Sequence, residues 1–147
     1  MVKERSSRRR FLHVVAHGGA VAGAACLGVA CGAGGGLGGV IAAGNVSALS
    51  VGSLQAVASV ALAVGRDAQG VYAMSLICPH EGCESDVQGT GVFCACHGSQ
   101  FDANGAVLRG PAQQPLDHYP VTIAATGEIS VDTSKTVDAS TRTAVPG

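Results

Sequence analysis

Two short segments rich in cysteine and histidine constrain this chain more than any other feature. They are Cys78-Pro79-His80-Glu81-Gly82-Cys83 and Cys94-Ala95-Cys96-His97-Gly98-Ser99. Each segment holds two Cys and one His, and disulfide chemistry alone explains neither the histidines nor their placement. Thiolates and imidazoles are typical zinc ligands, and zinc takes four of them. The six side chains therefore indicate a metal site with more candidate ligands than one zinc ion needs.

The hydrophobic core predicted from the sequence is small. The chain has 147 residues, and a folding pattern is visible only from about residue 46 to residue 133. A domain of that length buries only about 60% of the surface that its unfolded chain exposes. Trp is absent, and only five side chains are Phe or Tyr. We therefore expect a disulfide, a metal or both to stabilise the fold.

Short apolar segments of period two predict an all-β body without a helix. The expected elements are a hairpin over 57–77, a strand over 91–93, a hairpin over 101–107 with Asn104-Gly105 as its turn, and a strand pair over 121–124 and 129–131. Residues 78–91 lack an apolar period and are expected to form a loop. The polar tail after Thr133 is expected to be frayed.

The N-terminal third has the pattern of an export segment. Ser7-Arg8-Arg9-Arg10-Phe11-Leu12 resembles the twin-arginine export signal. No charged residue occurs from Phe11 to Gly44, a run long enough to cross a bilayer, which takes about 20 residues. We predict a signal or membrane anchor with a glycine-rich neck over residues 1–44, a domain over 45–133 and a polar tail over 134–147.

Three fates of this leader stay open. The alternatives are retention as a membrane anchor, cleavage after the small residues of Ile41-Ala42-Ala43, and lipid modification at Cys31. Each fate places the domain in the periplasm or on the outer face of the cytoplasmic membrane.

Charge is distributed unevenly along the chain. The first ten residues contain five basic side chains and one acidic side chain, whereas the other residues contain four basic and nine acidic ones. A nucleic-acid-binding domain needs clustered Lys and Arg on the domain itself. The acidic body therefore argues against a nucleic-acid partner.

The paired motifs C-P-H-x-G-C and C-x-C-H-G-S resemble those of Rieske iron–sulfur proteins of the cytochrome bc type. The similarity continues through Phe101-Asp102, Asn104-Gly105 and Arg109-Gly110-Pro111. It implies a small antiparallel β-sandwich with a cluster-binding loop subdomain, and a 2Fe-2S cluster as the cofactor. In that family two Cys bind one iron and two His bind the other. Carried over by position, the ligands are Cys78, Cys94, His80 and His97.

The resemblance assigns three further roles. Cys83 and Cys96 stand where the family has a disulfide, which requires an oxidising compartment. Ser99 stands where a hydroxyl binds a bridging sulfide of the cluster. Gly110-Pro111 stands where a proline loop covers the cluster.

Three features depart from the family pattern. Glu81 replaces an apolar residue that faces the quinol site in respiratory members, and Phe101 replaces a Tyr whose hydroxyl contacts the first Cys sulfur. Only 13 residues separate His80 from Cys94, so the connecting loop is short. Outside the motifs, His118 and Arg109 are expected to be solvent-exposed side chains without a binding role.

The resemblance implies a one-electron carrier rather than a stand-alone enzyme. The first hypothesis is the iron–sulfur subunit of a quinol-oxidising bc-type complex, with a membrane cytochrome b, a cytochrome c-type acceptor and a quinol as partners. The second is an electron-transfer subunit of another exported oxidoreductase, similar to arsenite oxidase. A cytoplasmic oxygenase ferredoxin is disfavoured by the export motif and the extra Cys pair. A structural zinc module is the hypothesis from a different class.

Overall fold

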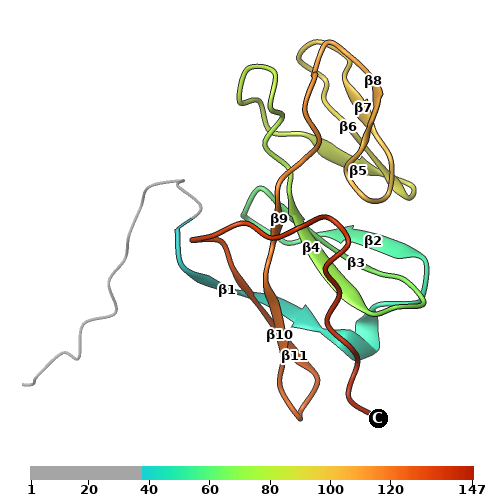
Figure 1. Cartoon of the computed structure of the whole chain (residues 1–147), viewed down its shortest axis with the longest axis vertical. Helices are drawn as coiled ribbons and strands as arrows, with labels where there is room; N and C mark the ends of the chain where they lie inside the picture. Colours follow the sequence, from blue (N-terminus) through green and yellow to red (C-terminus); the bar gives the residue numbers. More distant parts are fainter. Residues whose placement is uncertain (1–37) are drawn as a thin grey trace, which may run out of the picture. The chain divides into compact units, whose positions relative to one another are not determined.

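The computed structural model describes residues 38–147, whose regular elements are strands except for one short 3-10 turn, as the sequence predicts (Figure 1). The elements are β1 (Val40–Asn45), the 3-10 turn η1 (Val46–Ala48), β2 (Ser53–Ala56), β3 (Leu62–Arg66), β4 (Val71–Ser75), β5 (Asp86–Gln88), β6 (Gly91–Phe93), β7 (Gln100–Phe101), β8 (Val107–Arg109), β9 (His118–Tyr119), β10 (Val121–Ile123) and β11 (Glu128–Asp132). Within residues 38–147 there is no helix of the length and apolarity that a membrane span requires.

The strands form three antiparallel sheets. Two of them, with orders β1-β11-β10 and β2-β3-β4-β9, make up what we call the base. The third has the order β5-β6-β7-β8, and we call it, with its loops, the lobe. The lobe lies at the upper end of the domain in Figure 1, beyond β4 and β9. The expected β-sandwich with a separate loop subdomain is therefore confirmed.

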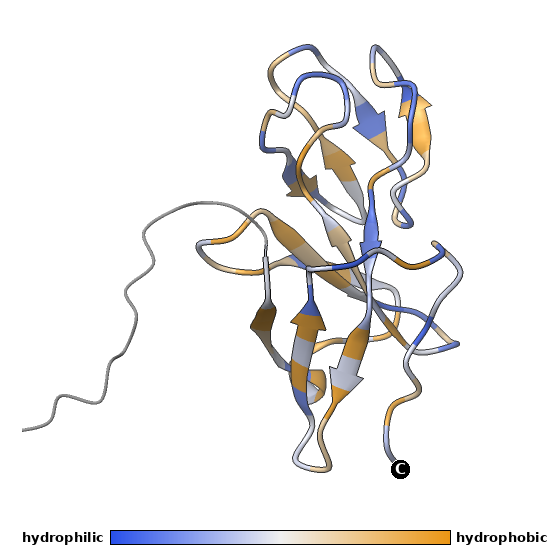
Figure 2. Cartoon of the chain, turned by 60° about the vertical axis from the view of Figure 1, so that its left-hand side comes forward, coloured by the Kyte–Doolittle hydropathy of each residue, from blue (hydrophilic) through white to orange (hydrophobic). Residues whose placement is uncertain are grey.

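Strands β3 and β4 are buried on both faces and form the centre of the domain. One face contributes Leu62, Val64 and Val71 to a core that includes Ile129 and Val131 of β11. The other face contributes residues such as Tyr72 and Met74 to a second core, which continues into the lobe. Figure 2 shows apolar residues, in orange, along the strands of both parts. Burying each large aliphatic side chain contributes about 1.5–3 kcal/mol.

The predicted hairpins are confirmed, with changes in their bounds. The hairpin within 57–77 is β3–β4, and its turn is stabilised by the Asp67 carboxylate, which accepts from the backbone N–H groups of Gln69 and Gly70. The hairpin within 101–107 is β7–β8, and only Gly105 of its predicted Asn-Gly turn has positive φ. The Asp102 side chain, which accepts from the N–H groups of Asn104 and Ala106, stabilises this turn instead.

Two segments that were predicted to lie outside the strands are paired. The predicted loop 78–91 contains β5, which pairs with β6. Residues 40–44, assigned to the leader, belong to β1 and pair with β11, while Thr133 bonds the carbonyl of Gly39 through its backbone and its hydroxyl. The folded domain therefore begins earlier than residue 45.

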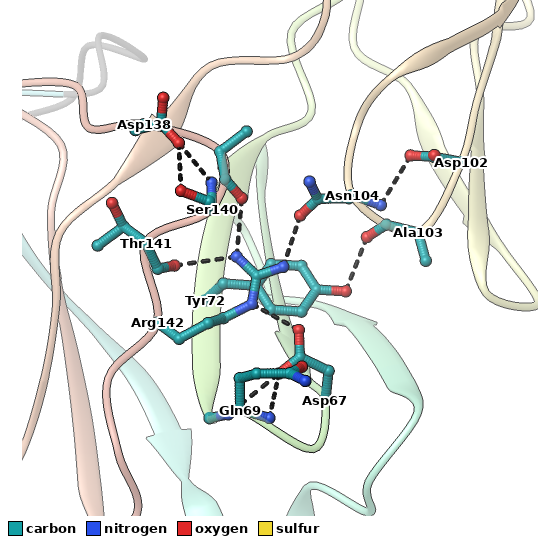
Figure 3. A network of polar contacts seen from close by, with 12 residues as sticks. Asp67, Gln69, Tyr72, Asp102, Ala103, Asn104, Asp138, Ser140, Thr141 and Arg142 are labelled. Carbon is teal, nitrogen blue, oxygen red and sulfur yellow. Dashed lines mark hydrogen bonds and ion pairs between the residues drawn. The ribbon is translucent and has the colours of Figure 1, made fainter.

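The C-terminal tail is packed against the domain, so the prediction of a frayed end is wrong. Thr143 exchanges two backbone hydrogen bonds of 2.9 Å with Val71. Arg142 forms an ion pair with Asp67, donates to the side chain of Asn104 at 2.7 Å, and lies 4.2 Å from the ring centroid of Tyr72 (Figure 3). One tail residue thus contacts the β3–β4 turn, strand β4 and the β7–β8 turn of the lobe.

His118 is buried, which contradicts the expected surface position. Only 3% of the residue is exposed, because β9 pairs with β4 and the tail residue Val137 bonds the His118 carbonyl. The ring Nδ1 lies 3.2 Å from the carbonyl oxygen of Leu116. Since a carbonyl only accepts, Nδ1 carries the hydrogen and Nε2 is unprotonated. Nε2 has no partner within residues 38–147.

Burial gives His118 a predictable effect on stability. Burial and, secondarily, the Arg142 charge hold the pKa of His118 below its usual value, although the Leu116 carbonyl opposes this shift. Below about pH 6.5 the unfolded chain therefore binds a proton that the folded protein excludes. As the pH decreases in this range, the free energy of unfolding decreases by up to about 1.4 kcal/mol per pH unit.

We expect a smaller decrease in His118→Asn, which keeps a donor near the Nδ1 position but does not titrate. The measurement is the unfolding free energy of both proteins between pH 7.5 and pH 5. Parallel pH dependences would show that His118 makes no contribution.

Candidate metal centre

The two Cys/His segments fold into loops closed by the same pair of backbone hydrogen bonds. In the first loop, Cys78 N–H donates to the Cys83 carbonyl at 2.8 Å and Gly82 N–H donates to the Cys78 carbonyl at 2.9 Å. In the second, Cys94 N–H donates to the Ser99 carbonyl and Gly98 N–H donates to the Cys94 carbonyl, each at 2.9 Å. These bonds hold each six-residue segment in one conformation.

Both loops need glycine at the fifth position. The φ angles of Gly82 and Gly98 are +74° and +79°, a region that side chains with a Cβ rarely adopt. The equivalent geometry explains why the two motifs share a glycine at this position.

The four predicted ligands form two pairs. Cys78 and Cys94 are buried free thiols that contact each other. His80 and His97 are exposed, with ring centroids 5.0 Å apart and planes at 81°. The thiols therefore lie in the hydrophobic interior, while the imidazoles are accessible to another molecule.

The surroundings of Cys94 favour a thiolate. Burial raises the pKa of this thiol, but the nearby Cys78 thiol, Ser85 hydroxyl and N–H groups of Cys96 and His97 lower it, and the net direction is downward. Since metals bind the thiolate form, these donors prepare Cys94 to act as a ligand.

Cys83 and Cys96 are bonded, as the resemblance implied. Their Cα atoms are 6.6 Å apart and the pair spans 13 positions of the sequence. The bond connects the two loops directly. It also leaves Cys78 and Cys94 as the free thiols among residues 38–147.

Ser99 and Phe101 are fully buried beside the thiols. Ser99 Oγ accepts from Ala112 N–H at 3.0 Å, which ties the second loop to the segment after Gly110-Pro111. Accepting uses only a lone pair, so the Ser99 hydroxyl proton is available to a further acceptor. Phe101 belongs to the same apolar cluster as Cys78 and Cys94. Arg109 is exposed, as expected.

Two neighbours of the site are not apparent from the sequence. Glu81 places a carboxylate oxygen 3.8 Å from Nε2 of His97, although its i+16 spacing gives no sign of this contact. The Ser85 hydroxyl lies near the Cys94 sulfur, and Ser85 follows the bridge between Ile77 and Glu84 at the base of the first loop. Each contact joins a residue of one Cys/His segment to a residue outside that segment, so the motif spacing does not predict it.

A comparison with known protein families identifies the domain. The Rieske 2Fe-2S domain family matches residues 40–120. The chain belongs to the Rieske family. Its cofactor is accordingly a 2Fe-2S cluster. The donors present fit this group, because two buried thiols and two imidazoles are the mixed ligands that distinguish Rieske centres from clusters bound by Cys alone.

Curated relatives are similar over part of their length. The cytochrome b6-f complex iron-sulfur subunit of Synechococcus sp. (strain WH7803) is 50% identical over 54 residues, which are 35% of this chain and 30% of the relative. The cytochrome bc1 complex Rieske iron-sulfur subunit of Corynebacterium efficiens is 39% identical over 66 residues, covering 42% and 16%. This Rieske chain therefore spans less than a third of the length of these relatives.

Solved structures with similar chains include the plasma membrane Rieske protein PetC3 of Synechocystis. That chain is 24% identical with a TM-score of 0.46, and the match covers 63% of this protein and 98% of PetC3. A chain from an oxygenase–ferredoxin complex of carbazole 1,9a-dioxygenase is also 24% identical, with a TM-score of 0.48 and coverages of 67% and 97%.

Proposed function

We propose that this Rieske protein is a one-electron carrier and the iron–sulfur subunit of a quinol-oxidising complex of the bc type. In this proposal Cys78 and Cys94 bind one iron, and His80 and His97 bind the other. The observation that carries it is the pairing of two buried thiols with two exposed imidazoles in loops joined by the Cys83–Cys96 disulfide. A bound 2Fe-2S cluster supplies a reversible one-electron couple between about −150 and +300 mV.

In this proposal the buried thiols and the exposed imidazoles have separate roles. Cys78 and Cys94 lie in the apolar core of the lobe, where water is excluded. His80 and His97 are exposed, so an imidazole nitrogen of either ring is positioned to hydrogen-bond a quinol hydroxyl and accept its proton. A membrane cytochrome b on the quinol side and a cytochrome c-type acceptor are the partners that this role requires.

Glu81 favours a second candidate function. Its carboxylate lies beside His97, on the exposed tip where a quinol would dock. A charged group there suits a polar protein interface better than an apolar quinone pocket. The second candidate is therefore the electron-transfer subunit of another exported oxidoreductase, similar to arsenite oxidase. Oxidation of the reduced protein by a c-type cytochrome is expected in both cases, whereas reduction by a quinol is expected only in the first.

We also propose export by the twin-arginine route to the outer face of the cytoplasmic membrane. The arginine motif, Cys31 and the glycine-rich neck up to Leu37 precede residue 38 and lie outside the described residues. Support comes from the Cys83–Cys96 disulfide, which needs an oxidising compartment. The double variant Arg8→Lys, Arg9→Lys should leave the protein in the cytoplasm, and normal export of this variant would contradict the proposal.

Strand β1 bears on how the leader is processed. Cleavage after Ala43 would remove the residues of β1 that pair with Ser130, Val131 and Asp132 of β11. We therefore propose that the leader is retained as an anchor or is separated before Gly39, whose carbonyl bonds Thr133. Mass analysis of the exported protein tests this, and a mature N-terminus at residue 44 would contradict it.

Phe101 is expected to set the reduction potential below the top of the Rieske range. A hydroxyl that donates to a cluster sulfur stabilises the more negative, reduced state, and Phe101 has none. Since such a bond differs by roughly 1–2 kcal/mol between the two states, Phe101→Tyr should raise the potential by about 40–90 mV. Ser99→Ala should lower it.

Protein-film voltammetry of the three proteins at one pH measures these shifts. An unchanged potential in the Tyr variant, with an intact cluster spectrum, would mean that the side chain at position 101 does not face Cys78.

A further inference from the structure

The Ser85 hydroxyl is buried next to the proposed ligands and lacks a hydrogen-bond acceptor within residues 38–147. Ser85 is 2% exposed, and its Oγ makes no hydrogen bond of good geometry within residues 38–147. Buried hydroxyls in folded proteins are almost always paired, because an unpaired one loses its bonds to water without replacement. The position of Ser85 therefore calls for an acceptor.

Backbone pairing fixes the position of Ser85, and its hydroxyl lies near the Cys94 sulfur. Ser85 N–H donates to the Leu76 carbonyl at 2.8 Å, and the adjacent residues Ile77 and Glu84 form an antiparallel bridge. This pairing holds the residue immediately beneath the first loop. The polar neighbours of the Cys94 sulfur are the Cys78 thiol, the Ser85 hydroxyl and the N–H groups of Cys96 and His97. Ser85 is the hydroxyl side chain in this set.

We propose that the Ser85 hydroxyl donates a hydrogen bond to Sγ of Cys94 when that sulfur binds iron, and that this bond raises the reduction potential. The inference rests on the proposed role of Cys94 as a ligand. A thiolate sulfur carries more negative charge in the reduced state, so a donor stabilises that state more strongly. Ser85 thus tunes the site from the segment that follows the first loop, whereas Ser99 and Phe101 belong to the second loop and to β7.

The experiment compares wild-type full-length holoprotein with Ser85→Ala, Ser85→Thr and the control Thr133→Val. Thr133 is also a buried hydroxyl residue, but it bonds the Gly39 carbonyl in the base. Ser85→Ala should lower the ratio of reduced to oxidised protein at a fixed potential roughly 3- to 10-fold, which is about 30–60 mV for one electron. In Ser85→Thr and Thr133→Val this ratio should change less than about 1.5-fold, which is about 10 mV for one electron.

A second readout reports the bond itself. Resonance Raman spectra of wild-type holoprotein in H2O and D2O should show a deuterium shift in the Fe–S(Cys) stretching bands, and this shift should be smaller in Ser85→Ala. If Ser85→Ala has full iron content but keeps the wild-type reduction potential and deuterium shift, the inference is overturned while the proposed function stands. Wild-type protein that binds no iron–sulfur cluster would overturn the proposed function on which the inference rests.

Discussion

Arg142→Ala is expected to lower the free energy of unfolding by about 2–4 kcal/mol. The variant loses the ion pair with Asp67, the hydrogen bond to Asn104 and the contact with the Tyr72 ring (Figure 3). Only 14% of the Arg142 side chain is exposed, so water replaces these partners incompletely. Because Asn104 belongs to the β7–β8 turn, we also expect the lobe to open more readily.

Denaturant unfolding and hydrogen exchange of the β7–β8 amides measure these effects. Lys135→Ala is the matched control, since it removes one positive charge from the same tail and breaks an exposed pair with Asp132. Exposed pairs contribute about 0–1 kcal/mol. Equal decreases in the free energy of unfolding of the two variants would contradict the assignment of Arg142 as the residue that joins the tail, base and lobe.

Removing the Cys83–Cys96 disulfide is expected to cost about 3 kcal/mol, because the bond closes a loop of about 13 residues in the unfolded chain. The double variant Cys83→Ser, Cys96→Ser should still assemble its cluster, since the four proposed ligands and the loop-closing hydrogen bonds remain. It should lose the cluster at a temperature roughly 10–20 °C lower than wild type does.

The loss of visible absorbance on heating gives this temperature for both proteins. Thiol counting on the exported wild-type protein supplies the control, which should show Cys83 and Cys96 unreactive. Equal melting of the two proteins would show that the backbone hydrogen bonds alone hold the loops together.

The sequence predicted those features that depend on local spacing. Turn residues such as Asp67 and the alternating apolar residues of β3 and β4 identify a hairpin without knowledge of the rest of the chain. The two Cys/His motifs identify the loops in the same way, since each closes on itself within six residues. The disulfide followed from the family resemblance and not from spacing.

Features that depend on distant pairing could not be predicted. His118 has the polar neighbours typical of a surface residue, but β4 and the tail cover it from segments that are remote in sequence. The tail looked frayed because it is polar, although its polar groups are the ones that bond Val71, Asp67 and Asn104. Ser85 lies outside both Cys/His motifs, and only the folded structure shows that its hydroxyl is a neighbour of the Cys94 sulfur.

The most direct test of the account is the metal and sulfide content of purified full-length protein, together with its EPR spectrum after reduction. We predict about two irons and two acid-labile sulfides per chain, with the low average g-value of mixed Cys and His ligation. Cys94→Ala should lose this signal, whereas the serine variant of the Cys83–Cys96 pair should keep it. One zinc per chain without iron, after expression under conditions that support cluster assembly, would contradict the account.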